Sequence, residues 1–215
     1  MRWLSLVRVV AAVVVAAFAS AALADVEVAM VTSLQGKVSR VAPLGPQPIE
    51  PFTKLKHGDL LSLAKGTVLQ IVYFENGREE TWRGAGRLEI TGNDSTPKGL
   101  APPQLRTLPA VLVKQVAKTP VLESQGRAGM MRVRGVASAE DIASVEGTYQ
   151  KLRLGRVGKD IMPELYLLSA MFELREFDRV DTALADLQRD QPANLDVPVV
   201  VSIYNKAVTN ARAAK

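Results

Sequence analysis

Cysteine is absent from the chain, and histidine occurs once among its 215 residues. Without cysteine there are no disulfides, so burial of apolar side chains must hold the fold together, and a lipid anchor on a cysteine is excluded. The usual zinc sites need cysteine or several histidines. We therefore predict a protein that binds no metal and carries no cofactor.

Motifs for catalysis are also lacking. His57 stands without a nucleophile or an orienting carboxylate, in a sequence typical of a turn before a strand. Residues 155–160 lack the first glycine and the hydroxyl residue of a phosphate-binding loop, so we expect a linker. Glu79 and Glu80 point to opposite faces of a strand, and we expect both on a hairpin surface. We predict no enzyme, although a catalytic set dispersed along the sequence would show only in its geometry.

Basic residues are in small excess over acidic ones, 27 against 22, which gives a net charge of +5. This bias is too small to indicate a nucleic-acid partner. Residues 98–136 are more uneven, with seven basic residues, one acidic residue and no aromatic one. We interpret them as a solvated connector; the alternative is a basic surface that faces anionic lipid or cell wall.

The N-terminus has the pattern of a secretory signal. Arg2 and Arg8 flank the start, residues 9–23 are uncharged, and Ala22-Leu23-Ala24 supplies the small residues of a cleavage site. The alternative is an uncleaved anchor, but the uncharged run falls short of the roughly 20 residues that span a bilayer. We predict cleavage after Ala24, a periplasmic protein and no stable membrane insertion.

Residues 26–91 have the pattern of strands, with short β-branched runs between glycine, proline and asparagine. Asn76-Gly77 predicts a type I′ hairpin that joins residues 67–74 to residues 79–83. The first of these strands is apolar on both faces, which is typical of a strand inside a sandwich or rolled sheet. Residues 96–109 contain four prolines and should have little regular structure; a short helix over 110–118 and a strand over 130–136 follow.

Helical spacing begins at Ser138, which with Asp141 resembles a capping box. A second helix starts near Asp160, a third runs over 177–189, and Asp196 opens a fourth. Short connections make neighbouring helices antiparallel. We predict an α+β protein, with an N-terminal all-β sandwich or rolled sheet and a C-terminal stack of helical hairpins.

The β half resembles FecR-like domains. The resemblance covers about residues 26–91 and rests on turn glycines and strand residues in a fixed order: Gly36-Lys37-Val38, Leu55, Gly58-Asp59-Leu60-Leu61, Gly66 to Ile71, Asn76-Gly77 and Gly86 to Ile90. It implies a small periplasmic β-fold, known from regulators that relay ferric-citrate transport to a membrane-bound sigma factor system. The chain differs from those regulators because it lacks a cytoplasmic segment and a central membrane span.

One helical hairpin, residues 163–194, resembles a tetratricopeptide repeat. Leu184 and Pro192 follow Phe177 at the spacing of that repeat, and Leu167 and Leu168 fall where its first helix packs. The sequence departs from the pattern in three ways: Glu164 and Val180 replace the usual Trp and Ala, and the glycine between the two helices is missing. The resemblance implies protein binding on a concave helical face. The chain then divides into a signal peptide (1–24), a FecR-like β domain (25–95), a basic connector (96–137) and a tetratricopeptide-like domain (138–215).

These features predict a non-enzymatic periplasmic binding or scaffold protein that contacts another envelope protein. The alternative is a module that binds peptidoglycan or another glycan through the hairpin and the basic stretch. Tyr73 and Trp82 are the candidate ligand contacts, because they could form an exposed aromatic platform. The competing interpretation is that these two rings pack across strands.

Overall fold

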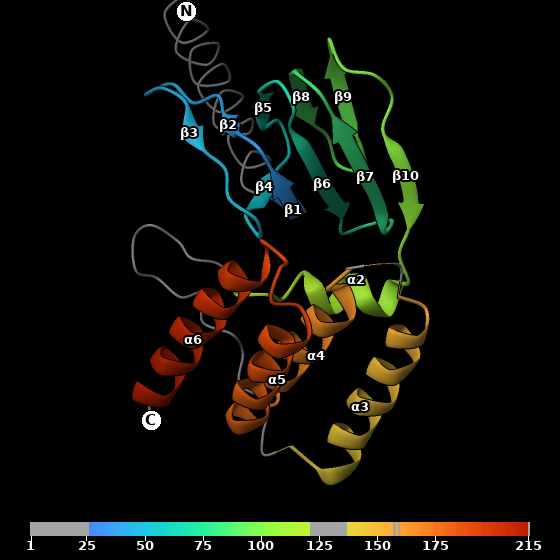
Figure 1. Ribbon diagram of the computed structural model, residues 1–215, viewed down its shortest axis with the longest axis vertical. Helices are drawn as coiled ribbons and strands as arrows, with labels where there is room; N and C mark the ends of the chain where they lie inside the picture. Colours follow the sequence, from blue (N-terminus) through green and yellow to red (C-terminus); the bar gives the residue numbers. More distant parts are fainter. Residues whose placement is uncertain (1–25, 121–136, 157, 159, 215) are drawn as a thin grey trace, which may run out of the picture.

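Figure 1 shows the computed structural model, which describes residues 26–120, 137–156, 158 and 160–214. In the described residues, two antiparallel five-stranded sheets come first and five helices follow, which confirms the predicted α+β class. The predicted signal peptide (1–24) and the strand predicted over 130–136 lie outside the described residues.

The first sheet, sheet A, has the strand order β10-β7-β6-β1-β4. Its strands are β1 (Glu27–Gln35), β4 (Lys54–Lys56), β6 (Val68–Tyr73), β7 (Arg78–Arg83) and β10 (Gln104–Thr107). The predicted strand with two apolar faces is β6, in the middle of this sheet. Leu69, Ile71 and Tyr73 face the second sheet, whereas Val72 on the other face contacts the helices.

The second sheet, sheet B, has the order β3-β2-β5-β8-β9. Its strands are β2 (Val38–Arg40), β3 (Gln47–Pro48), β5 (Leu60–Leu63), β8 (Gly86–Ile90) and β9 (Ser95–Lys98). Apolar residues of both sheets form one buried cluster, to which sheet A gives Leu69 and Trp82 and sheet B gives Leu61 and Leu88. The two sheets therefore close over a common core, as a sandwich does.

The predicted hairpin between β6 and β7 is present, but the predicted turn type is wrong. Gly77 has a positive φ of 68°, whereas Asn76 is not among the residues with positive φ. A type I′ turn needs positive φ at both positions. The connection is instead the longer loop 74–77, closed by a hydrogen bond of 3.1 Å from the Gly77 N–H to the Tyr73 carbonyl.

The first part of the predicted connector is also different from the prediction. Residues 96–109 supply most of β9 and all of β10, which are edge strands of the two sheets. Proline is tolerated at a sheet edge because one side of an edge strand donates no ladder hydrogen bond, and Pro97 lies in β9. The predicted short helix is α2 (Ala110–Val116).

The four predicted C-terminal helices are confirmed. They are α3 (Ala139–Leu154), α4 (Met162–Glu173), α5 (Phe177–Asp190) and α6 (Val197–Ala213). Ser138 and Asp141 form the predicted capping box at α3. In α5 the predicted apolar stripe is buried.

Helix α2 lies between the strands and the other helices (Figure 1). Its residues Leu112, Val113 and Val116 belong to a second buried cluster, which continues from the helices to Met30 and Val72 on the outer face of sheet A. The sheets and the helical stack are thus joined by apolar packing as well as by the chain.

Candidate functional site

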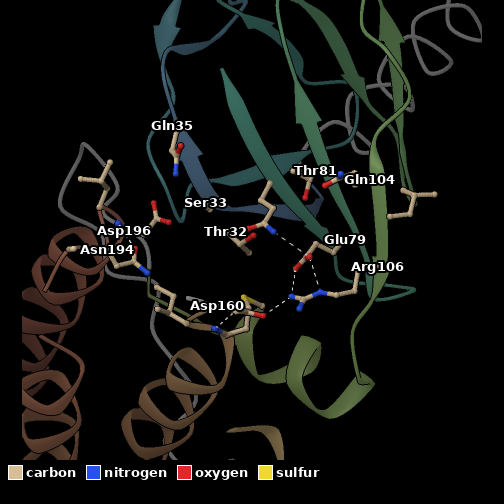
Figure 2. Close-up of a pocket in the computed structure, with 16 residues that line it drawn as sticks. Thr32, Ser33, Gln35, Glu79, Thr81, Gln104, Arg106, Asp160, Asn194 and Asp196 are labelled. Carbon is tan, nitrogen blue, oxygen red and sulfur yellow. Dashed lines mark hydrogen bonds and ion pairs between the residues drawn. The ribbon is translucent and has the colours of Figure 1, made fainter. Parts of the chain in front are cut away.

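Figure 2 shows a cleft where the outer face of sheet A meets the starts of α4 and α6. Strands β1, β6, β7 and β10 line one side, and residues 160–162 and 193–196 line the other. We call it the junction cleft; its volume is about 530 Å³. Its walls are mostly polar, in contrast to the neighbouring part of the same sheet face, where Met30 and Val72 are buried against helices.

A row of polar side chains crosses four strands in the junction cleft. Ser33 on β1 pairs with Gln70 on β6, Gln70 with Thr81 on β7, and Thr81 with Gln104 on β10. All four residues line the cleft. Because neighbouring strands lie about 4.8 Å apart, the row presents a hydroxyl or amide group at that interval. We call these four residues the polar row.

Thr32 lies beside the polar row at a bulge in β1. The register of β1 against β6 shifts between Val31 and Ser33, which leaves Thr32 as the extra residue. The side chain is 4% exposed and lines the cleft, and its hydroxyl has no hydrogen-bond partner. Buried hydroxyls are normally paired, so this one is a candidate contact for a bound molecule.

Three charged residues connect sheet A to α4 at the side of the cleft. Arg106 donates to both oxygens of Glu79, with Nε–Oε1 and Nη2–Oε2 distances of 2.9 Å, and its Nη2 also donates to Asp160 Oδ2 at 2.7 Å. Asp160 Oδ1 in turn accepts the Met162 N–H at the start of α4. Burial raises the pKa of Glu79, and the hydrogen bond and charge of Arg106 oppose that rise. We call these residues the Glu79–Arg106–Asp160 cluster.

Asp196 closes the cleft at its β1 end. It is buried at the N-cap of α6. Burial raises the pKa of Asp196, and hydrogen bonding to the Ser33 side chain and the Leu34 backbone opposes the rise. Among the described residues that line the cleft, Arg106 is the only basic one, against the carboxylates of Glu79, Asp160 and Asp196. The cleft therefore has a negative formal charge.

A second concave surface, the helical groove, lies between α3 and α5 with α4 at its base. Its volume is about 790 Å³. Leu167 and Met171 of α4 and Leu187 of α5 lie at its base, where Leu167 is partly exposed and the other two are buried. Gly147 of α3 leaves space in one wall. A Cβ added at Gly147 would meet no atom within 4 Å.

Ion pairs cross the helical groove near its two ends. Glu146 of α3 pairs with Arg179 of α5, and Arg153 of α3 pairs with Asp190 of α5 at 3.3 Å. All four side chains are at least a third exposed, so these pairs contribute little to stability and can exchange partners.

Glu164 at the base of the groove is more buried. Its Oε1 is 3.4 Å from Arg156 Nη1, whereas its Oε2 is buried without a partner. Burial raises the pKa of Glu164.

The two candidate ligand contacts from the sequence are both buried. Tyr73 is 0% and Trp82 is 1% exposed, so neither forms an exposed platform. The Tyr73 hydroxyl lies 2.6 Å from the Ser95 hydroxyl, and burial raises the pKa of Tyr73. The Trp82 Nε1–H donates to Glu80 Oε2 at 2.9 Å. Both rings belong to the sandwich core, since strand β6 and strand β7 place them on the face that sheet B covers.

Glu79 and Glu80 do not lie on the hairpin surface. That expectation is wrong, because both side chains are buried beside an arginine. They do point to opposite faces, as predicted.

His57 lies in the predicted turn between β4 and β5. Residues 155–160 connect α3 to α4 as predicted, and Asp160 at their end joins the junction cleft.

The residues of the junction cleft were missed by sequence reasoning. Arg106 and Asp160 are 54 positions apart, and no local pattern links them. One signal was present: Gln70 lies between Val68 and Val72 on an otherwise apolar face of β6. A polar residue in such a position indicates that part of the face is not covered by apolar packing.

Within the described residues, no group of three or more His, Cys, Asp or Glu side chains is arranged to hold a metal ion. In the same part of the chain, no helix is both long enough and apolar enough to cross a bilayer. Comparison of the chain with protein-family models, with curated proteins and with solved structures gave no match.

Proposed function

We propose that the protein is an exported, non-enzymatic binding or scaffold protein of the bacterial cell envelope, and that it contacts a segment of another envelope protein through the helical groove. The observation that carries this proposal is the groove itself. Apolar side chains lie at its base, a gap lies at Gly147, and exposed ion pairs lie at its ends. A partner segment with apolar residues at its centre and charges at its ends would match this arrangement.

The packing of α4 supports the choice of this surface. Ser169 and Glu173 of α4 face α2, where both are hydrogen-bonded to Gln115. Glu164, Leu167 and Met171 recur at helical spacing on a different face of α4, which α2 does not cover. On this face Glu164 and Met171 are buried, and Leu167 is the partly exposed residue that a partner would contact.

For the alternative of a glycan-binding module, the hairpin does not offer the expected aromatic contact. Trp82 is buried in the sandwich core. Arg106 and Lys118 of the basic stretch are already paired with Glu79 and Glu173.

A photo-crosslinking experiment in the native cells tests the proposal. A crosslinking residue at Gln150 lies in the groove, whereas one at the adjacent exposed Lys151 does not line it. We expect one discrete protein adduct from position 150 and none from position 151. The substitution Gly147→Trp should fill the groove and abolish the adduct, and Ser144→Trp on the same helix but outside the groove should not. No protein adduct at position 150, or an adduct unaffected by Gly147→Trp, would contradict the proposal.

A further inference from the structure

The junction cleft is separate from the helical groove and shares none of its lining residues. Its chemistry is different as well, because hydroxyl, amide and carboxylate groups replace the apolar base of the groove. The two surfaces therefore suit different ligands, and a ligand in the junction cleft does not require a protein in the groove.

We propose that the junction cleft binds a linear oligosaccharide that carries amino groups, with its sugar rings along the polar row and an ammonium group near Asp196. Four observations support this ligand class: the spacing of the polar row, the number of unpaired polar groups, the unpaired hydroxyl of Thr32 and the charge of the cleft.

The spacing of the polar row suits a sugar chain better than a peptide. Ser33, Gln70, Thr81 and Gln104 follow one another at the strand spacing of about 4.8 Å, which is close to the advance per ring in a β-1,4-linked oligosaccharide. An extended peptide advances only about 3.3 Å per residue, so successive peptide groups would not align with successive side chains of the polar row.

The polar groups of the cleft are available to a ligand. Thr81 and Gln104 have no side-chain hydrogen bond within the described part of the chain, and Gln70 has one long contact of 3.4 Å to Glu79. The Thr32 hydroxyl is unpaired in the wall behind them. Hydroxyl and amide side chains can both donate and accept, as the hydroxyl groups of a sugar do.

The charge of the cleft favours a cationic ligand. Arg106 already satisfies Glu79 and Asp160, and Asp196 at the Ser33 end faces a hydroxyl and a backbone N–H but no cation among the described residues that line the cleft. An ammonium group there would form a charge-assisted hydrogen bond, which is stronger than a neutral one.

Titration calorimetry of the purified protein with two probes tests this inference: the β-1,4-linked tetramer of glucosamine and the tetramer of N-acetylglucosamine. The first carries ammonium groups and the second does not. We expect the glucosamine tetramer to bind about tenfold more tightly, which is the effect of one charge-assisted hydrogen bond.

Two variants identify the site. Thr81→Val keeps the shape of the side chain but removes its hydroxyl, and it should weaken binding of the glucosamine tetramer about fivefold. Thr107→Val is the matched control, because Thr107 lies on β10 outside the cleft and should leave binding unchanged. Asp196→Asn should weaken binding of the glucosamine tetramer and leave that of the acetylated tetramer unchanged, a difference in specificity that mere loss of stability would not produce.

Three results would overturn the inference. They are the absence of heat from the glucosamine tetramer at millimolar concentration, equal affinity for the two tetramers, and equal effects of Thr81→Val and Thr107→Val. Each leaves the crosslinking result at Gln150 unaffected, so failure here is distinct from failure of the proposed function.

Discussion

Glu79 and Glu80 are neighbours on β7, and both are buried carboxylates with an arginine partner, yet they have different roles. Glu80 faces sheet B and accepts from Trp82 and from Arg78, which lie on its own strand, with an Arg78 Nε–Oε1 distance of 2.6 Å. Glu79 faces the helices and binds Arg106 of β10, which also binds Asp160 at the start of α4.

The difference lies in which parts of the chain each carboxylate joins. The Glu80 contacts are local and fix side chains inside the sandwich. The Glu79 contacts join a strand pair to a helix more than fifty positions away, at the edge of the junction cleft. Loss of the first set should affect the stability of the sandwich, and loss of the second should affect the coupling between the sandwich and the helices.

The largest effect is expected on the Glu80 side. Trp82→Ala removes the largest fully buried side chain of the sandwich and leaves Glu80 Oε2 without its donor. We expect the free energy of unfolding to fall by about 3 to 5 kcal/mol. Urea unfolding followed by far-UV circular dichroism measures this, and Trp82→Phe, which keeps most of the volume, should cost less. A loss below about 1 kcal/mol for Trp82→Ala would show that the core tolerates the cavity.

Gly77 lies where the β6–β7 hairpin meets the residues before α2. Its φ is 68°, and an added Cβ would lie 2.7 Å from the Leu108 carbonyl oxygen. We expect Gly77→Ala to cost about 3 kcal/mol from left-handed backbone strain and overpacking together. Gly66→Ala is the matched control, because Gly66 has a φ of 78° and open space around it, and it should cost only about 1 to 2 kcal/mol. Thermal denaturation compares the two; equal losses would mean that the contact with Leu108 has no effect.

The coupling on the Glu79 side is tested with Arg106→Met. The substitution leaves the buried Glu79 carboxylate unpaired, and because the Arg106 side chain is 34% exposed we expect a loss of about 2 kcal/mol, less than for a fully buried pair. Trp82 is the only tryptophan after residue 24, so its fluorescence reports the sandwich while circular dichroism at 222 nm reports the helices. The two unfolding transitions should separate in this variant, with the helices unfolding first.

The double variant Glu79→Met, Arg106→Met is the control for that experiment. It removes both charges of the pair, so it should be less destabilised than the single variant. Coincident transitions in Arg106→Met would show that apolar packing at Met30 and Val72 is sufficient to couple the two parts.

Most elements of the fold could be predicted from the sequence because their signals are local. The capping box at Ser138 and the stripe of α5 depend on residues a few positions apart, and both are present. The two apolar faces of β6 predicted a strand between two packed layers. The β9 and β10 strands were missed because proline is compatible with an edge strand, and the propensity of a single segment does not show where an edge will be.

The clefts could not be predicted, since they depend on contacts between distant segments. The polar row needs the register of four strands, and Arg106 meets Asp160 only because α4 begins beside β10. The expected exposed platform at Tyr73 and Trp82 is wrong for a related reason: sheet B covers that face of the hairpin, and alternation along a strand does not say which of its faces remains open.

The smallest effect on the free energy of unfolding is expected at Glu164, a third buried carboxylate that can be compared with Glu79 and Glu80. Both oxygens of Glu79 and of Glu80 have donors, whereas Glu164 Oε2 has none. Burial raises the pKa of Glu164 in the folded protein above its pKa in the unfolded chain. The charged carboxylate therefore destabilises the fold fully at pH values above the folded-state pKa. This destabilisation disappears as the pH falls below the unfolded-state pKa, where both states are protonated. Glu164→Gln, which is neutral at every pH, should therefore be more stable than the parent by about 1 kcal/mol at pH 7.

The pH dependence separates this cause from a change in packing. The gain from Glu164→Gln should shrink between neutral pH and about pH 4, because the parent carboxyl becomes protonated in both the folded and the unfolded state. Urea titrations at pH 7 and pH 4 measure the two values. A gain that is equal at both pH values would come from packing of the amide rather than from removal of the charge. A loss at pH 7 would mean that Arg156, 3.4 Å from Oε1, already stabilises the carboxylate by more than its burial costs.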